Sequence, residues 1–226
     1  MTRGVKVLVA ALVLAVSATV AVAAPRILHR ARFFRVHEIE VTGLRYLDRD
    51  EVVRRLLLAR DASIADPIAP ILAAAEAIPG VVAASVEKRM PGTLRVTLLE
   101  ATPVALAAQS ERLVLLDQRG RVLPFDPARV PVSLPIAEPD SATAAVLTRV
   151  MTTDTGWFAR IERAHREGGD VLFDEGPHRV RLRVGATAAT LRAISAVRDY
   201  LDRKSVSWRE IDARYQDRVF VRKGSA

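Results

Sequence analysis

Residues 79–100 read PGVVAASVEKRMPGTLRVTLLE. After the initial proline and glycine, apolar or small residues alternate with their neighbours at Val82, Ala84 and Val86, which is typical of a strand. The turn Met90-Pro91-Gly92 is followed by β-forming residues from Thr93 to Leu99. The segment therefore predicts two strands joined as a hairpin.

One further strand and two helices are predicted upstream of this hairpin. The strand ends at Thr42-Gly43 and is marked by Phe34, Val36, Ile39 and Val41. Asp48, with Glu51 three residues later, resembles a capping box and predicts the start of one helix. Asp66 is predicted to cap a second helix, with Pro67 in its first turn, that stops at Pro79-Gly80. The order β-α-α-β-β predicts an α+β fold in which two helices cover one face of a small sheet.

The N-terminus contains an apolar run from Val7 to Ala24 that has no charged residue. At ~1.5 Å per residue, a helix of this run approaches the ~30 Å thickness of the bilayer hydrocarbon. We predict a transmembrane helix at residues 7–24, between a cytoplasmic tail (1–6) and a juxtamembrane linker (25–33). The basic residues before the run predict a single-pass type II topology, with the C-terminal domain outside the cytoplasm. A cleavable signal peptide, with Ala21-Val22-Ala23 at its cleavage site, is the alternative, and the length of the run favours the anchor.

The composition excludes several classes of chemistry. The chain has 226 residues, a net charge of +8 and no cysteine, which excludes disulfides, iron-sulfur clusters and cysteine-ligated zinc. Its basic residues are scattered among acidic ones and its aromatic residues are few, so no nucleic-acid surface is predicted. No nucleotide-binding or hydrolase motif is present, and no metal pattern includes any of the four histidines, His29, His37, His165 and His178.

The C-terminal part of the chain predicts a second sheet with helices. A hairpin is expected where Leu113–Leu116 is followed by Asp117, Gly120 and Val122-Leu123. A helix is predicted at 146–151, and strands are predicted at 171–173 and 180–184. The next helix has an apolar face of Leu191, Ile194, Val197 and Leu201. Its solvent side is predicted to include Arg192, Arg198 and Asp199.

The order of these motifs resembles the FtsQ/DivIB family of bitopic bacterial division proteins. Segment 36–106 resembles the POTRA (polypeptide-transport-associated) domain of that family, through Ile39–Gly43, Pro79–Val81, Ala84–Arg89, Pro91–Leu94 and Glu100–Ala105. Further along, Asp117 to Gly120, Leu134-Pro135 and Ile211–Tyr215 resemble the family's D-x-x-G hairpin, Leu-Pro element and closing I-D-L-R-Y. The resemblance predicts a POTRA domain at 34–103, an FtsQ-type β domain at 104–222 and a tail at 223–226.

The resemblance implies a non-enzymatic scaffold of the cell inner membrane that links early and late division proteins at the septum. The implied partners are the coiled-coil division proteins FtsB and FtsL and other septal proteins, with no cofactor, metal or small-molecule substrate. In the family they dock at the end of the second domain, which here is Arg214, Tyr215, Gln216, Val219, Phe220 and Val221. The composition of this terminal strand also suits strand addition. A strand that only completes the sheet is the alternative, and the family resemblance favours partner binding.

Two other functions compete with the division scaffold. One is a POTRA-bearing transport or chaperone module for exported polypeptides, although the alternating strands of a membrane barrel are not visible. The other is a secreted wall hydrolase with Glu100 as a lone general acid, which lacks the second carboxylate that glycosidic chemistry needs. Glu100 is instead predicted to be a structural residue at the junction between the two domains.

Overall fold

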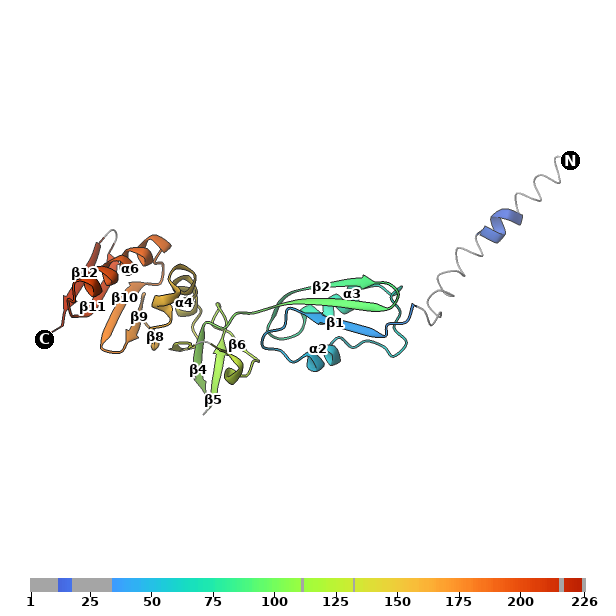
Figure 1. The fold of residues 1–226 in the computed structure, drawn as a ribbon, viewed down its shortest axis with the longest axis horizontal. Coiled ribbons are helices and arrows are strands. Elements are labelled where there is room, and N and C mark those ends of the chain that lie inside the picture. The colour runs from blue at the N-terminus through green and yellow to red at the C-terminus, as the bar shows by residue number, and fades with distance from the viewer. Residues whose placement is uncertain (1–11, 18–33, 111, 132, 216–217, 225–226) are drawn as a thin grey trace. The chain divides into compact units, whose positions relative to one another are not determined.

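The structure is a computed structural model that describes residues 12–17, 34–110, 112–131, 133–215 and 218–224. The chain folds into two compact units, Met1–Glu100 and Ala101–Ala226 (Figure 1). Residues 12–17 are helical, and the remainder of the predicted membrane segment 7–24 lies outside the described residues. Within the described ranges, no helix has the length and apolarity needed to cross a membrane.

The first unit contains a three-stranded sheet in the order β1-β3-β2. Its strands are β1 (Glu38–Thr42), β2 (Val81–Arg89) and β3 (Thr93–Glu100). Strands β2 and β3 are antiparallel, as the predicted hairpin requires, whereas β1 pairs with β3 in parallel. Along the chain, helices α2 (Arg49–Arg55) and α3 (Ala69–Glu76) follow β1 and precede β2 (Figure 1). The predicted β-α-α-β-β order is confirmed.

The core of the first unit lies between the sheet and the two helices. Strand β3 contributes Leu94, Val96 and Leu98, and these pack with Val52 of α2 and Ala75 of α3. The three β3 residues are two apart, so they lie on one face of the sheet. Both helices therefore cover this face.

The two predicted helix starts differ in their outcome. Asp48 is the N-cap of α2, and its carboxylate accepts hydrogen bonds from the backbone N–H groups of Asp50 and Glu51. The predicted cap at Asp66 is wrong, because α3 begins after Ile68 without a side-chain cap. The Asp66 carboxylate instead accepts from the backbone N–H of Ser63 at 2.7 Å, which closes a turn before the helix.

Glu100 is buried at the end of β3, with 7% of its surface exposed. Its carboxylate accepts backbone N–H hydrogen bonds from Arg45, Tyr46 and Leu47 at 3.0, 2.8 and 3.0 Å. Gly43 begins this loop with φ +85°, and a Cβ there would lie 2.0 Å from a backbone oxygen of Leu98. Glu100 thus has a structural role, and the bonds that define it lie within the first unit.

The second unit is built on a nine-stranded sheet in the order β12-β11-β10-β9-β8-β7-β4-β5-β6. Its strands are β4 (Ala105–Gln109), β5 (Arg112–Leu116), β6 (Val122–Leu123), β7 (Ile136–Ala137), β8 (Arg163–Glu167), β9 (Asp170–Glu175), β10 (His178–Arg183), β11 (Trp208–Tyr215) and β12 (Arg218–Lys223). The predicted hairpin at Asp117 connects β5 to β6. The Asp117 carboxylate accepts from the backbone N–H groups of Arg119 and Arg121 at 2.8 and 2.9 Å.

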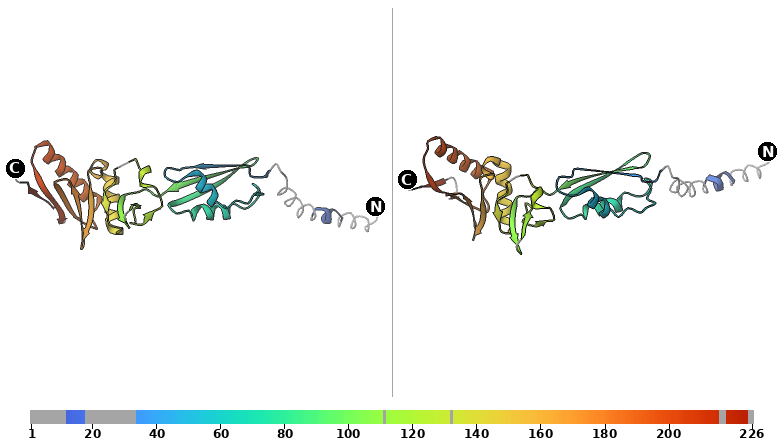
Figure 2. Two further views of the ribbon diagram at one scale, coloured as in Figure 1. Left: turned by 90° about the horizontal axis from the view of Figure 1, so that it is seen from below. Right: turned by 60° about the horizontal axis from the view of Figure 1, so that its bottom comes forward.

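Helices of the second unit cover one face of strands β8–β11. They are α4 (Ser141–Thr153), α5 (Thr155–Phe158) and α6 (Ala188–Arg203), and α6 runs along the strands in Figure 2. The covered face is formed by alternate residues that are fully buried, such as Phe173, Val180 and Ile211, which are paired across β9, β10 and β11. The other face of these strands contains the charged residues between them.

The prediction that Arg198 faces solvent is wrong. Arg198 is 4% exposed and forms an ion pair with Glu175, whose carboxylate also accepts from Trp157 Nε1. Glu175 lies two residues after Phe173 on β9, so it points to the covered face and requires a buried counter-charge. Arg198 is four residues after Ile194 and lies on the same side of α6 as the apolar stripe. Arg192 and Asp199 are exposed, as predicted.

Candidate protein-binding site

Strand β12 is the last strand of the nine-stranded sheet. It pairs with β11 on one side, and no strand of the described chain pairs with its other side. The strand has the sequence RVFVRK, with three basic residues and no acidic one. An open edge of this kind offers backbone donors and acceptors to an added strand, and its charge favours an acidic partner segment.

Two exposed aromatic residues lie together beside this edge. Tyr215 and Phe220 are each 51% exposed, and their rings meet edge to face with centroids 5.2 Å apart. Regular pairing would set Phe220 opposite Asp212 and leave Tyr215 on the other face of the sheet. The register shifts between Asp212 and Tyr215, and Tyr215 consequently pairs with Arg218, which lies on the Phe220 face. The bulge therefore creates the aromatic pair.

Arg214 is held by two carboxylates rather than left free. Its guanidinium donates to both Asp212 oxygens, at 2.9 and 2.7 Å, and to Asp170 at 3.2 Å. The hydrogen bonds that Arg214 donates to Asp212, and next to Asp170, raise the pKa of Arg214 above its usual value, and Arg214 in turn lowers the pKa of Asp212. The guanidinium carbon also lies 5.7 Å from the centroid of the Tyr215 ring. Arg214 thus positions Tyr215.

A hollow of about 600 Å³ adjoins Arg214 and Tyr215. Its lining includes Arg183 at the end of β10 and Thr187, the N-cap of α6, and it contains no acidic residue. The hollow extends the exposed aromatic pair into a larger concave surface, and both of its charged side chains are arginines.

The structure brings together three of the six residues predicted to bind a partner, Arg214, Tyr215 and Phe220. Val219 and Val221 are half-buried, and Val221 pairs with buried Ile211 on the helix-covered side. Gln216 lies outside the described residues. The sequence analysis did not include Asp170, which lies far from the terminal motif along the chain.

Charge pairs occupy the open face of the sheet next to this site. Arg179 bonds to Asp174 at 2.9 Å, Arg181 bonds to Glu167 at 2.7 Å, and Arg222 of β12 pairs with a carboxylate on β11 at 3.2 Å. The described part of the chain holds no group of three or more histidine or carboxylate side chains arranged to bind a metal ion. The arrangement suits recognition of a polypeptide by strand pairing, aromatic contact and charge.

Comparison with known proteins yields one match to a family model. The model described as "POTRA domain, FtsQ-type" matches residues 34–101, the segment that contains β1, α2, α3, β2 and β3. A solved structure that is similar is the major extracytoplasmic domain of the trans isomer of the cell division protein DivIB from Geobacillus stearothermophilus. It is 16% identical with a TM-score of 0.34, over 46% of this chain and 96% of that chain. No curated protein matches the sequence.

The first unit therefore defines a POTRA-domain protein. Its POTRA domain, at residues 34–101, is of the FtsQ type. A domain of this type implies a role in cell division.

Proposed function

We propose that this protein is a non-catalytic scaffold of the division machinery that links early and late division proteins at the septum. The observation that supports this function is the FtsQ-type POTRA domain at residues 34–101. In the proposed organisation, the POTRA domain spans 34–103 and an FtsQ-type β domain spans 104–222, each with its own binding surface. The two surfaces would allow one chain to hold two division proteins at once.

The proposed surface of the second unit is the open edge of β12 with Tyr215 and Phe220. Its partners are coiled-coil division proteins of the FtsB and FtsL type. The partner strand adds to β12 through backbone hydrogen bonds, while the aromatic pair and the adjoining hollow receive its side chains. Aromatic residues suit this role, since they bury a large area on binding with little loss of side-chain freedom.

The variant Phe220→Asp tests this surface. Phe220 is half exposed, so the substitution removes the aromatic contact and is expected to leave the fold intact. The matched control is Tyr200→Asp, which changes an aromatic residue on α6 that is 54% exposed. FtsB- and FtsL-type partners should co-purify with the wild type and with Tyr200→Asp, and be lost with Phe220→Asp. Unchanged co-purification with Phe220→Asp would refute the surface.

We further propose a single transmembrane anchor at residues 7–24, with both domains outside the cytoplasm. An N-terminal fusion to a fluorescent protein that matures only in the cytoplasm tests orientation and location together. A midcell band in dividing cells is the expected result. A uniform membrane rim would contradict the septal role, and a signal detached from the membrane would contradict the anchor.

A further inference from the structure

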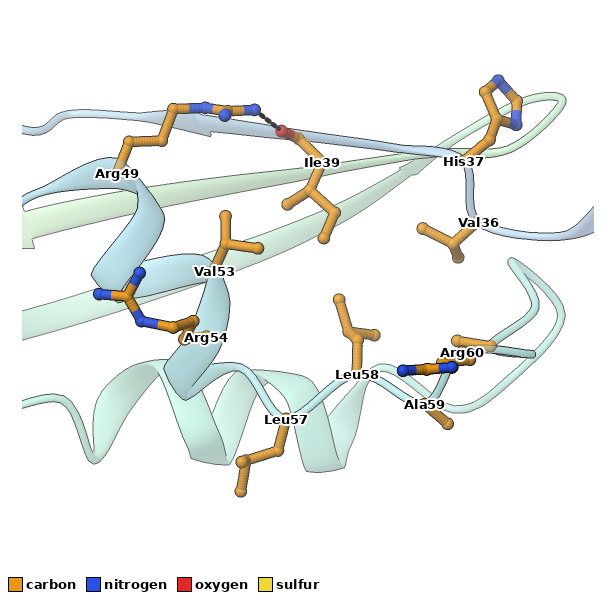
Figure 3. A pocket seen from close by; sticks show the side chains of 11 residues that line it. Val36, His37, Ile39, Arg49, Val53, Arg54, Leu57, Leu58, Ala59 and Arg60 are labelled. Carbon is orange, nitrogen blue, oxygen red and sulfur yellow. Dashed lines mark hydrogen bonds between the residues drawn. The ribbon is translucent and has the colours of Figure 1, made fainter.

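A cleft of about 670 Å³ lies in the POTRA domain between β1 and the segment that follows it (Figure 3). One wall is the N-terminal part of β1 and the residues before it, and the other is α2 with the loop 57–62. Strand β1 is an edge strand of its sheet, and the residues just before it are joined to the loop by a bridge between Arg35 and Ser63. The cleft belongs to the first unit alone, so it is separate from the β12 edge.

The centre of the cleft is apolar. Val36, Val53 and Leu58 point toward its interior in Figure 3, whereas Leu57 points away. These three side chains are only partly buried, so the folded domain leaves part of their apolar surface exposed to solvent. A partner that covers them gains free energy from burial of that surface.

The cleft is bordered by cations and contains no acidic lining residue. Its charged lining residues are Arg49, Arg54 and Arg60, with His37 near one end. Arg49 donates to the backbone oxygen of Ile39 at 2.8 Å, as Figure 3 shows, and Arg54 bonds to Glu51, which lies outside the lining. Arg60 forms no hydrogen bond or ion pair with any residue that the structure describes, so its charge is available to a ligand.

We propose that this cleft binds an acidic amphipathic segment of a partner polypeptide. One apolar side chain of the segment fills the space between Val53 and Leu58, and flanking carboxylates pair with Arg60 at one end and Arg49 at the other. A polypeptide supplies both features on one chain. An anionic lipid headgroup would satisfy the arginines but would leave the apolar centre without a specific contact.

The test selects ligands from a phage-displayed library of random linear peptides on the full-length protein in detergent micelles. Peptides with an apolar residue flanked by Asp or Glu should be enriched. Arg60→Glu should weaken their binding about tenfold, because an attractive charge contact becomes repulsive. Val53→Ser should weaken it about fivefold through lost apolar contact. The control Arg89→Glu reverses a half-exposed arginine on β2, the opposite edge of the sheet, and should leave binding unchanged.

Several results would overturn the proposal. It fails if no peptide is enriched relative to the Arg60→Glu protein, or if enriched peptides bind that variant as tightly as the wild type. Binding to vesicles of phosphatidylglycerol and phosphatidylcholine is measured as well. The proposal also fails if Arg60→Glu abolishes binding to these vesicles but leaves peptide binding unchanged, since the occupant would then be a lipid. Phe220→Asp should leave peptide binding at the cleft unchanged, so failure here is distinct from failure of the β12 surface.

Discussion

Replacement of Glu100 by Gln should destabilise the first unit by about 3 kcal/mol. The carboxylate accepts three backbone N–H bonds, from Arg45 and Tyr46 on one oxygen and from Leu47 on the other. An amide has one acceptor oxygen, so one N–H group faces an N–H₂ group and loses its bond. A hydrogen bond to a charged acceptor contributes about 1.5–3 kcal/mol and a neutral one about 1 kcal/mol, so one lost and two weakened bonds give this total.

Hydrogen exchange of the full-length protein, read by mass spectrometry on peptides from β1 and β3, measures this loss. Exchange protection in these strands should fall by about two powers of ten, which corresponds to about 3 kcal/mol. The control is Glu87→Gln, which changes an exposed glutamate of β2 with a side chain 63% exposed. If protection in Glu100→Gln matches that of Glu87→Gln, the loop does not depend on the carboxylate and our reasoning is refuted.

Two predictions concern the second unit, where both tryptophans provide a fluorescence signal for urea unfolding. Arg198→Met alone should destabilise this unit by about 3–5 kcal/mol, because it leaves Glu175 buried without its counter-charge. Glu175→Leu combined with Arg198→Met should restore part of the loss, since it removes the buried charge but leaves Trp157 Nε1 without its acceptor. If the double variant is as unstable as the single one, the pair is not the cause. Asp212 has a pKa lowered by its hydrogen bonds with Arg214. Its contribution is present above the unfolded pKa of about 3.9 and is lost as the pH falls through the lower folded value, so Asp212→Asn should reduce the loss of stability below about pH 4. An identical pH profile in this variant would contradict that assignment.

Local sequence was sufficient to predict most helices and strands. The alternation at Val82–Val86, the turn at Met90–Gly92 and the cap at Asp48 depend on contacts between residues close in the chain. The prediction that Asp66 caps a helix was wrong because it also used only local sequence, and an Asp before a proline suits both a helix cap and a turn. The structure uses it in the turn, where the backbone N–H of Ser63 is its donor.

The sequence by itself predicted the three-stranded sheet with two helices, several strands and helices of a second sheet, and the motifs that identify the FtsQ-type domain. The tertiary structure decided which side chains meet across the sheet. Glu175 brings Arg198 into the core, Asp170 holds Arg214, and the β11 bulge sets Tyr215 beside Phe220. Strand order and register create these contacts between residues distant in the chain, and a one-residue shift in register moves a side chain to the opposite face. Periodicity within a segment contains no information about that register, so these features could be seen only in the folded chain.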